Sequence, residues 1–291
     1  MQVFVNSFRY LAQRLQIVWL LLVFLPAIGS HVAAQTPVIP NYWSPNEHVS
    51  RPDVSSIGRL RFLTTTDFPP FNFIDRSKRI AGFHVDLARA ICDELDILAK
   101  CQIQAAPWDE LQKMVEDGEA EAIIAGLRPT AELRSRFEFS RAYLYIPGRF
   151  VAKRQNGFGE PMTEVVRGRK TGLVTGSVHE NWFRQAFPDA EVVAFGDRAA
   201  ALDALRKEEV DLAFSDALSL SFWLTSPAAA ECCAFAGGPY FSTEDLSRGL
   251  AIAFAPGRED LVTAVDFALR QLSDKGIFAE LYLRYFPISF Y

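Results

Sequence analysis

Charged and aromatic side chains stand where buried strands are expected to end. Asp216 closes the apolar run VDLAFSD, where its carboxylate could receive a ligand ammonium. Arg128 and Arg134 follow another such run, and a guanidinium can hold a carboxylate through two parallel hydrogen bonds. Phe68 and Trp108 lie near two further strand ends, where two rings could hold a ligand side chain between them. Together these groups suit an α-amino acid or a similar small zwitterion.

Each of these residues also has a purely structural interpretation. Asp216 could cap a helix over residues 217–224, a role that can coexist with ligand binding. The two arginines could belong to a solvated face, and most aromatic side chains belong to cores. The residue types alone leave both interpretations open.

Signatures of catalysis and of metal binding are missing from the sequence. It contains no GxSxG, HExxH or glycine-rich phosphate loop, and His179-Glu180 lacks a second histidine at the spacing a zinc site needs. The four histidines are scattered, so we expect surface or capping roles for them. No CxxC or CxxH spacing occurs among the four cysteines. We therefore expect a protein that is not an enzyme and that carries no metal ion or other cofactor.

The composition is that of a globular protein with a slight excess of acid. Of the 291 residues 49% are hydrophobic and 22% are charged, which excludes intrinsic disorder. The length allows one large domain or two modest ones. Lys and Arg number 30 against 35 Asp and Glu, which gives a formal net charge of −5. Because no basic surplus is available to neutralise phosphates, we expect no nucleic-acid partner.

Residues 1–34 have the pattern of a secretory signal peptide. Arg9 and Arg14 precede an apolar run over 17–29, and small residues lead up to Ala34. The run is shorter than the roughly 20 residues that span a bilayer, which argues against a membrane anchor. We expect cleavage after Ala34 and a soluble, exported protein, because no later segment is long and apolar enough to span a membrane.

After export the four cysteines would lie in an oxidising compartment. Cys92 comes late in an amphipathic helix pattern and Cys101 opens a strand pattern, and a corner between two such elements can bring the pair within bridging distance. We expect a Cys92–Cys101 disulfide. Cys232 and Cys233 are adjacent, and they could form a bridge with each other or remain buried free thiols.

Strand and helix patterns alternate through most of the chain. Residues 35–57 are rich in Pro, Ser and Asn without a period, which predicts an N-terminal extension or linker. From Leu60 onward the alternation predicts α/β layers on mainly parallel sheets, whose ligands bind beyond the carboxyl ends of the strands. Residues 108–126 and 198–216 repeat one order of amphipathic helix, charged turn and buried strand. This repeat favours two related lobes over one larger sheet.

A series of motifs follows in the order of a known protein family. Between about residues 60 and 285 these are TTTDFPPFNF, GFHVDLARAIC, the unit at 108–126, FEFSRAYLY, GLVTGSVHE, VDLAFSD and LRQLSDKGIFAELYLRYF. They resemble the polar amino-acid-binding family of periplasmic solute-binding proteins, which serve ABC importers. The resemblance implies the two-lobed α/β fold of type II periplasmic binding proteins, with two crossover strands as a hinge.

The resemblance also implies domain boundaries. The crossovers would lie near 150–154 and 246–250. Lobe 1 would then comprise residues 58–152 and 246–291, and lobe 2 would comprise residues 153–245. Such a protein is expected to close around one small amino-acid-like ligand in the periplasm, as a monomer, and to deliver it to an ABC permease of the inner membrane.

Family binding residues correspond to several positions of this chain. The resemblance assigns the stacking aromatics to Phe68 and Trp108, and backbone contacts with the ligand to Gly126 and its neighbours. It assigns a helix start to Ser177, whose free N–H groups would attract an anion, and the amine-receiving acid to Asp216. A helix-to-strand disulfide like the expected cysteine pair is similar to one found in some members.

The chain departs from the family pattern at the carboxylate clamp. Where the family motif T-x-x-R has its arginine, this chain has Leu133, and Arg134 comes one position later. A shift of one residue turns a helical side chain by about 100°. Arg128 stands where the family has a Ser or Thr and could supply the cation instead. Val178 replaces a small hydroxyl residue after the serine of the second lobe.

Two other functions remain open on the same scaffold. One is an enzyme similar to the cyclohexadienyl dehydratases, for which Glu180 or Glu132 could be the proton donor. The other is an accessory protein of a periplasmic dehydrogenase system that no longer takes part in transport. The altered carboxylate clamp and the adjacent cysteines would fit the second alternative.

Overall fold

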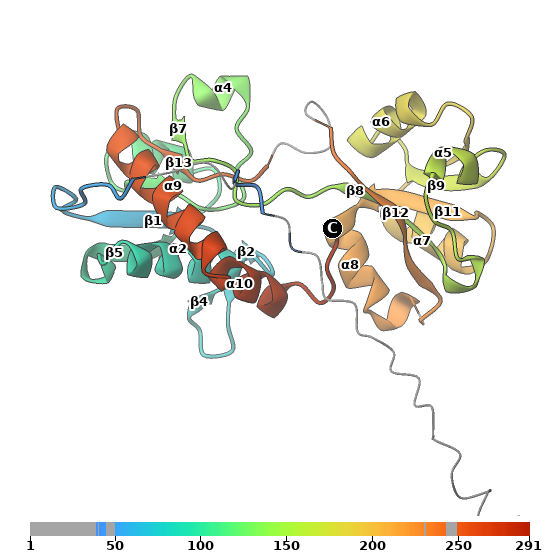
Figure 1. Ribbon diagram of the computed structural model, residues 1–291, viewed down its shortest axis with the longest axis horizontal. Coiled ribbons are helices and arrows are strands. Elements are labelled where there is room, and N and C mark those ends of the chain that lie inside the picture. The colour runs from blue at the N-terminus through green and yellow to red at the C-terminus, as the bar shows by residue number, and fades with distance from the viewer. Residues whose placement is uncertain (1–38, 40, 45–49, 230, 243–248) are drawn as a thin grey trace, which may run out of the picture. The chain divides into compact units, whose positions relative to one another are not determined.

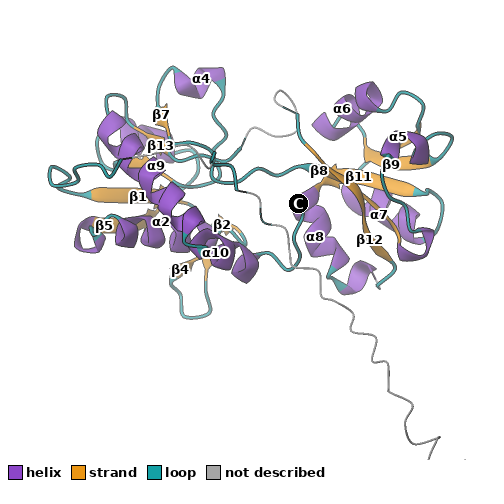
Figure 2. Cartoon of the chain, in the orientation of Figure 1, coloured by secondary structure: helices purple, strands orange, loops and turns teal. Residues whose placement is uncertain are grey.

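The computed structural model describes residues 39, 41–44, 50–229, 231–242 and 249–291 (Figure 1). The predicted signal peptide and its cleavage site lie outside these residues, as does most of the expected crossover at 246–250. The described elements form two five-stranded sheets and a small three-stranded sheet. In Figure 2 helices accompany the strands of both larger sheets, as expected for α/β layers.

The first sheet combines strands from widely separated parts of the sequence. In sheet order they are β5 (Cys101–Ala105), β1 (Leu60–Thr64), β6 (Ala122–Ile123), β13 (Ala253–Phe254) and β7 (Glu138–Phe139). Strand β1 pairs in parallel with β5 and β6, whereas β13 is antiparallel to both of its neighbours. The central strands are buried almost throughout, because helices cover both faces of the sheet.

Successive residues of β1 face different cores. Phe62 belongs to a core shared with helices α2 (Phe83–Glu94), α9 (Glu259–Asp274) and α10 (Ile277–Tyr285). Leu63 belongs to a second core, shared with α3 (Leu111–Glu116) and next to α4 (Ala131–Arg134). This alternation is the two-residue period of a strand. Because β1 and β6 pair in parallel, their carboxyl ends lie at the same edge of the sheet.

A small antiparallel sheet follows β1 and leads into α2. Its strands are β2 (Asp67–Phe68), β3 (Asn72–Ile74) and β4 (Ile80–Ala81). Gly82 connects β4 to the helix with φ +129°, and a Cβ atom there would lie 2.3 Å from the carbonyl oxygen of Phe71. Only glycine allows this approach, which holds the small sheet against the start of the helix.

The second sheet is assembled from the middle of the chain. In sheet order its strands are β10 (Glu191–Phe195), β9 (Lys170–Val174), β11 (Leu212–Asp216), β8 (Gly148–Lys153) and β12 (Cys233–Tyr240). Its helices are α5 (Met162–Val165), α6 (Val178–Ala186), α7 (Arg198–Arg206) and α8 (Ala217–Leu224). Three short 3-10 helices complete the list of described elements. The first, η1 (Leu98–Lys100), precedes β5, and the other two, η2 (Arg154–Asn156) and η3 (Pro227–Ala229), lie between strands of the second sheet.

The chain passes from the first sheet to the second just before β8. Strand β8 is hydrogen-bonded to β11 and β12 along its length, so Gly148–Lys153 belongs to the second sheet. Just before β8, Leu144 accepts a hydrogen bond of 2.7 Å from the amide of Leu250, which follows the second sheet in the sequence. The incoming and outgoing segments are thus paired with each other in antiparallel fashion.

The two repeated sequence units form corresponding elements in the two sheets. In the first, α3 leads through a charged turn into β6, which pairs in parallel with β1. In the second, α7 leads through a charged turn into β11, which pairs in parallel with β9. The prediction of two related units is therefore confirmed at the level of the elements.

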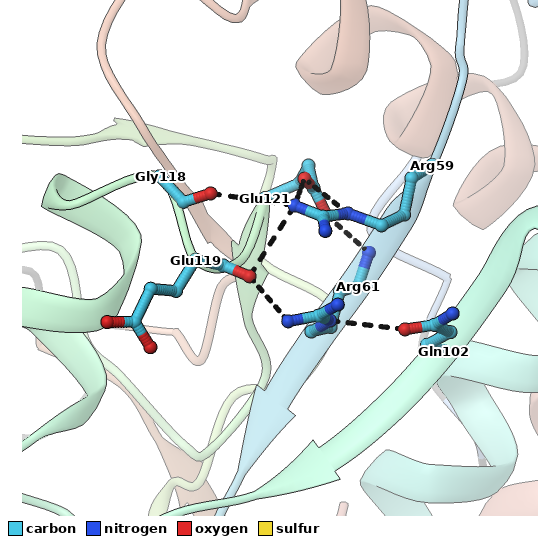
Figure 3. Close-up of polar contacts among 6 residues, drawn as sticks. All are labelled: Arg59, Arg61, Gln102, Gly118, Glu119 and Glu121. Atoms are coloured by element: carbon cyan, nitrogen blue, oxygen red, sulfur yellow. Dashed lines mark hydrogen bonds and ion pairs between the residues drawn. The ribbon is translucent and has the colours of Figure 1, made fainter.

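Two arginines before and within β1 hold the charged turn of the first unit in place (Figure 3). The guanidinium of Arg59 donates to the Glu121 carboxylate at 2.6 Å, and that carboxylate also accepts from the Arg61 amide at 2.7 Å. The Arg61 guanidinium donates to the Glu119 carbonyl at 2.7 Å and to Gln102 at 3.2 Å. These contacts lie at the amino end of β1, so they position β6 from the end opposite the expected ligand.

The described part of the N-terminal extension packs on the protein and is not a free linker. Trp43 lies under the guanidinium of Arg141, whose Cζ atom is 4.3 Å from the ring centre. Arg270 of α9 donates to the Ser44 carbonyl at 2.7 Å. Ile39, Trp43 and Val54 contact the core of the first sheet, although none of the described residues of this segment lies in a helix or strand.

All four cysteines are paired. Cys92 at the end of α2 is bonded to Cys101 at the start of β5, across a Cα–Cα distance of 6.3 Å, as predicted. Cys232 is bonded to Cys233, which decides between the two alternatives in favour of the adjacent bridge. Within the described ranges no group of three or more His, Cys, Asp or Glu side chains is arranged to hold a metal ion. Nor does any described helix have the length and apolarity to cross a membrane.

Candidate ligand-binding site

A cavity of about 310 Å³ lies at the carboxyl ends of β1 and β6. Its lining residues are Thr65, Asp67, Phe68, Trp108, Ala125 and Gly126. A cavity of this volume is large enough for an amino acid or another small metabolite. Three of the residues singled out in the sequence, namely Phe68, Trp108 and Gly126, therefore come together in one place.

The Phe68 ring forms a firm wall of this cavity. It is 39% exposed, and its other face stacks on the buried Phe71 ring with 4.8 Å between the ring centres. Phe71 in turn lies 4.8 Å from the ring of the buried His84. Because its support is packed on both sides, Phe68 offers a fixed aromatic surface to a ligand.

Trp108 supplies the second aromatic surface. It follows Pro107 in the turn between β5 and α3, and it is 50% exposed. It also lines a neighbouring cavity of about 310 Å³ that shares Thr65 and Asp67 with the first. An indole this exposed is uncommon in a core position and is available to stack on a bound molecule.

Gly126 allows the backbone to approach the Phe68 ring. Its φ angle is +88°, and a Cβ atom would lie 3.0 Å from Cε1 of Phe68 and 3.7 Å from Cε1 of His84. A side chain would be strained there and would press on the ring. The turn after β6 thus lines the cavity at Gly126 without a side chain.

A buried hydrogen-bonded chain lies beneath the cavity, and sequence reasoning missed it. Tyr143 Oη is 2.8 Å from Nε2 of His84, whose Nδ1 is 2.6 Å from Oδ1 of Asn72. The Asn72 amide nitrogen donates to the Thr65 hydroxyl at 2.6 Å. Each of these four side chains is at most 4% exposed, so the expected surface or capping role is wrong for His84. Burial lowers the pKa of His84 to about 3, which keeps the imidazole neutral.

Neither candidate arginine lines the cavity. Leu133 is partly buried and packs against the core beside α3. Arg134 is exposed and its Cζ lies 5.6 Å from the ring centre of Phe139. Arg128 is exposed in the turn after β6 and forms no hydrogen bond or ion pair with any other described residue. Of the two, Arg128 is the cation that has no competing contact with an aromatic ring.

Ser177 and Glu180 satisfy backbone amides at the start of α6. The Ser177 hydroxyl accepts from the Glu180 amide at 3.1 Å, and the Glu180 carboxylate accepts from the Gly176 amide at 2.7 Å. Arg184 donates to the same carboxylate at 2.7 Å. The hydrogen bonds from Arg184 and Gly176 lower the pKa of Glu180, so this carboxyl group is held in its ionised form.

Asp216 is held by its own half of the fold. One carboxylate oxygen caps α8 by accepting from the Ser219 amide at 2.7 Å, and the other accepts from Arg198 at 2.8 Å. The expected helix cap is thus confirmed. The neighbouring His179 is mostly buried, and burial lowers its pKa although the Asp216 carboxylate acts in the opposite direction. A ligand ammonium at Asp216 would have to share this carboxylate with Arg198.

Three comparisons place the protein among known ones. Residues 60–288 match the family model described as bacterial extracellular solute-binding proteins, family 3. The chain is 28% identical over 227 residues to a putative ABC transporter arginine-binding protein 2 of Escherichia coli (strain K12), covering 78% of this chain and 90% of the relative. It is 24% identical to the L-arginine-binding protein of Pseudomonas aeruginosa, covering 84% of this chain and 93% of the relative.

Solved structures show the same fold. The unliganded L-cystine solute receptor of Neisseria gonorrhoeae matches with a TM-score of 0.70 at 18% identity, over 81% of this chain and 96% of that one. An ancestral cyclohexadienyl dehydratase matches with a TM-score of 0.64 at 16% identity, over 82% and 98% of the two chains. The two-lobed α/β fold of type II periplasmic binding proteins is therefore confirmed. Since the family model spans most of its length, this chain belongs to the bacterial extracellular solute-binding proteins, family 3.

Proposed function

We propose that this protein is a periplasmic solute-binding protein that captures an amino acid or a related small polar metabolite for an ABC importer. The observation that carries the proposal is the cavity of about 310 Å³ between Phe68 and Trp108, at the carboxyl ends of parallel strands. Membership of the family and relatives named for arginine, lysine, cystine or histidine binding support it. Export through a cleaved signal peptide, a monomeric state and an inner-membrane permease partner belong to the same proposal.

The two sheets supply different parts of the site in this proposal. The first sheet contributes the aromatic walls, and the second contributes the start of α6 at Ser177 and the carboxylate of Asp216. A ligand held by both sheets would favour a closed form, because only contacts that differ between two states shift their equilibrium. We take the sheet order as the lobe boundary, so that lobe 2 begins at Gly148 and not at residue 153.

Arg128 is the better candidate for the ligand carboxylate. Its side chain is exposed, and it lies two positions after Gly126 in the turn that follows β6. It has no hydrogen-bonding partner among the described residues. Arg134 lies over an aromatic ring one helix further on, where Leu133 has replaced the clamp residue of the family. A guanidinium without a partner can bind a carboxylate without breaking an existing contact.

Neither Glu180 nor Glu132 is well suited to be the proton donor of a dehydratase. Glu180 accepts hydrogen bonds from Arg184 and Gly176, and its lowered pKa opposes the role of proton donor. Glu132 is exposed on α4 and does not line the cavity. We therefore propose binding without turnover, and incubation with prephenate should give no product. Formation of phenylpyruvate would contradict this part of the proposal.

The test is a thermal-shift screen of the purified protein against the L-amino acids and L-cystine, followed by titration calorimetry of each compound that raises the melting temperature. We expect at least one to bind, and Phe68→Ala and Trp108→Ala each to weaken it. Leu283→Ala is the matched control, because Leu283 is 47% exposed on α10 and does not line the cavity. The proposal is wrong if no compound of the panel binds the unmodified protein.

A further inference from the structure

The buried chain from Tyr143 to Thr65 ends at the ligand cavity. Thr65 lines the cavity, whereas Asn72, His84 and Tyr143 lie behind it with no more than 4% of any side chain exposed. The four residues come from four separate segments of the first half, and each contacts the next at hydrogen-bonding distance. Such a chain can transmit one property to the residue that lines the cavity, namely the direction in which each hydrogen bond points.

The direction can be worked out from the far end. The described contacts of the Tyr143 hydroxyl are limited to His84, so a donor at Nε2 would leave the buried tyrosine proton without an acceptor. An unsatisfied buried donor is costly, and the tyrosine therefore donates to Nε2. A neutral imidazole that accepts at Nε2 carries its proton on Nδ1, which donates to Oδ1 of Asn72. The Asn72 amide nitrogen is then the group that faces Thr65.

This direction determines what Thr65 can offer. Its oxygen already accepts the Asn72 amide, so its own proton cannot point back into the chain. No other described residue takes that proton in a hydrogen bond. The neighbouring Thr64 differs, because its hydroxyl donates to the Ile124 carbonyl at 2.8 Å. Among the residues that line this cavity, Thr65 thus has a hydroxyl whose proton remains available to a ligand.

We propose that Tyr143, His84 and Asn72 are positioning residues that turn the Thr65 hydroxyl into a hydrogen-bond donor toward the cavity, where it binds an acceptor oxygen of the ligand. The proposal rests on the proposed function, since it names a specificity contact of the same site. It predicts that ligands with a carboxylate, amide or carbonyl oxygen at this point bind more tightly than analogues with a methyl group there. The burial that keeps His84 neutral also keeps the direction of the chain constant across the physiological pH range.

The first test needs no ligand. In protein labelled with ¹⁵N-histidine, the His84 signals are assigned by their loss in His84→Gln. We expect a protonated Nδ1 and an unprotonated Nε2 in the unmodified protein. A proton on Nε2 would reverse the chain, turn Thr65 into a donor to Asn72 and overturn the proposal.

The second test uses the amino acid that binds best in the thermal-shift screen. Tyr143→Phe removes the group that orients the chain, and we expect about 2- to 10-fold weaker binding, the effect of one neutral hydrogen bond. Thr65→Val should weaken ligand binding at least as much, and Thr65→Ser should restore the affinity because serine retains the hydroxyl. Tyr285→Phe is the control, since its hydroxyl bonds Asp86 on the same half without reaching the cavity.

The two proposals fail in different ways. If the unmodified protein binds an amino acid but Tyr143→Phe and Thr65→Val bind it equally well, the positioning role is wrong and the proposed function stands. If no compound of the panel binds the unmodified protein, the proposed function fails and the ligand contact of Thr65 fails with it. Recovery by Thr65→Ser separates loss of the hydroxyl from a general disturbance of the cavity.

Discussion

Asp216 has two structural partners, and they determine how its role in binding should be tested. Its carboxylate caps α8 through the Ser219 amide and pairs with Arg198. Asp216→Ala removes both contacts at once, so loss of binding in this variant could reflect a displaced helix. Asp216→Asn keeps the cap, because asparagine caps helices as well as aspartate does, and removes only the charge.

The structure sets the size of the effects on stability. Loss of the helix cap costs about 1 kcal/mol, and the half-exposed ion pair contributes roughly 0.2–1 kcal/mol. Asp216→Ala should therefore lower the free energy of unfolding by about 1–2 kcal/mol, which lowers the melting temperature by roughly 2–8 °C. Asp216→Asn should lower the free energy of unfolding by no more than about 1 kcal/mol, and the melting temperature by no more than roughly 4 °C.

The effect of Asp216→Asn on binding should be larger than its effect on stability. A charge-assisted hydrogen bond contributes about 1.5–3 kcal/mol, or roughly 10- to 150-fold in affinity. Because Arg198 already compensates part of the charge, we expect the lower end, about 10-fold weaker binding by calorimetry. Arg198→Ala should have the opposite effect and strengthen binding of an ammonium ligand, since it removes the competing cation.

Asp203→Asn is the matched control for these measurements. Asp203 also pairs with basic side chains of the second half, on the exposed side of α7, but it caps no helix. The Asp203→Asn variant should bind the ligand with the same affinity as the unmodified protein. If Asp216→Asn binds within twofold of the unmodified protein, Asp216 does not receive the ligand ammonium. Weaker binding by Arg198→Ala would instead assign Arg198 to a ligand carboxylate.

Three further perturbations test separate parts of the structure. Gly126→Ala should cost about 1–2 kcal/mol because of its positive φ, and should weaken binding by pressing on Phe68; unchanged affinity would remove that turn from the site. His84 is buried in its neutral form, with a pKa of about 3, so as the pH falls the unfolded state takes up a proton before the folded state does. The free energy of unfolding should therefore fall as the pH drops below 6.5, by up to about 1.4 kcal/mol per pH unit. Urea denaturation between pH 7 and pH 5 should show a smaller slope for His84→Gln, and equal slopes would contradict the assignment. Trp43→Ala should lower the free energy of unfolding by about 2 kcal/mol if the extension stabilises the first half, and no change in the urea midpoint would argue that it does not.

The elements of this fold follow from local patterns that can be read in the sequence. The apolar spacing of residues 85, 88, 91 and 92 predicts the buried face of α2, and all four are buried in the structure. The repeated units predict one helix and one parallel strand in each sheet. The corner between α2 and β5 brings Cys92 and Cys101 together because the two residues are only 9 positions apart in the sequence. Local propensity and hydrophobic period suffice for such features.

The partners of the candidate site residues could not be derived in this way. The sequence indicates a helix cap for the Asp216 carboxylate but no ion pair, whereas in the structure α7 brings Arg198 to it from another segment. The one-residue shift at Leu133 and Arg134 is visible in the sequence, but only the packing of α4 turns the leucine into the core and leaves the arginine outside.

The sequence by itself determined the family, the order of elements and the aromatic residues of the cavity, since each is encoded by neighbouring residues. Only the tertiary structure decided which polar groups are already satisfied. Thr65, Asn72, His84 and Tyr143 are spread over almost eighty positions, and no periodicity links them. Hydrogen bonds between such groups depend on the register and packing of separate elements, and these are properties of the whole fold.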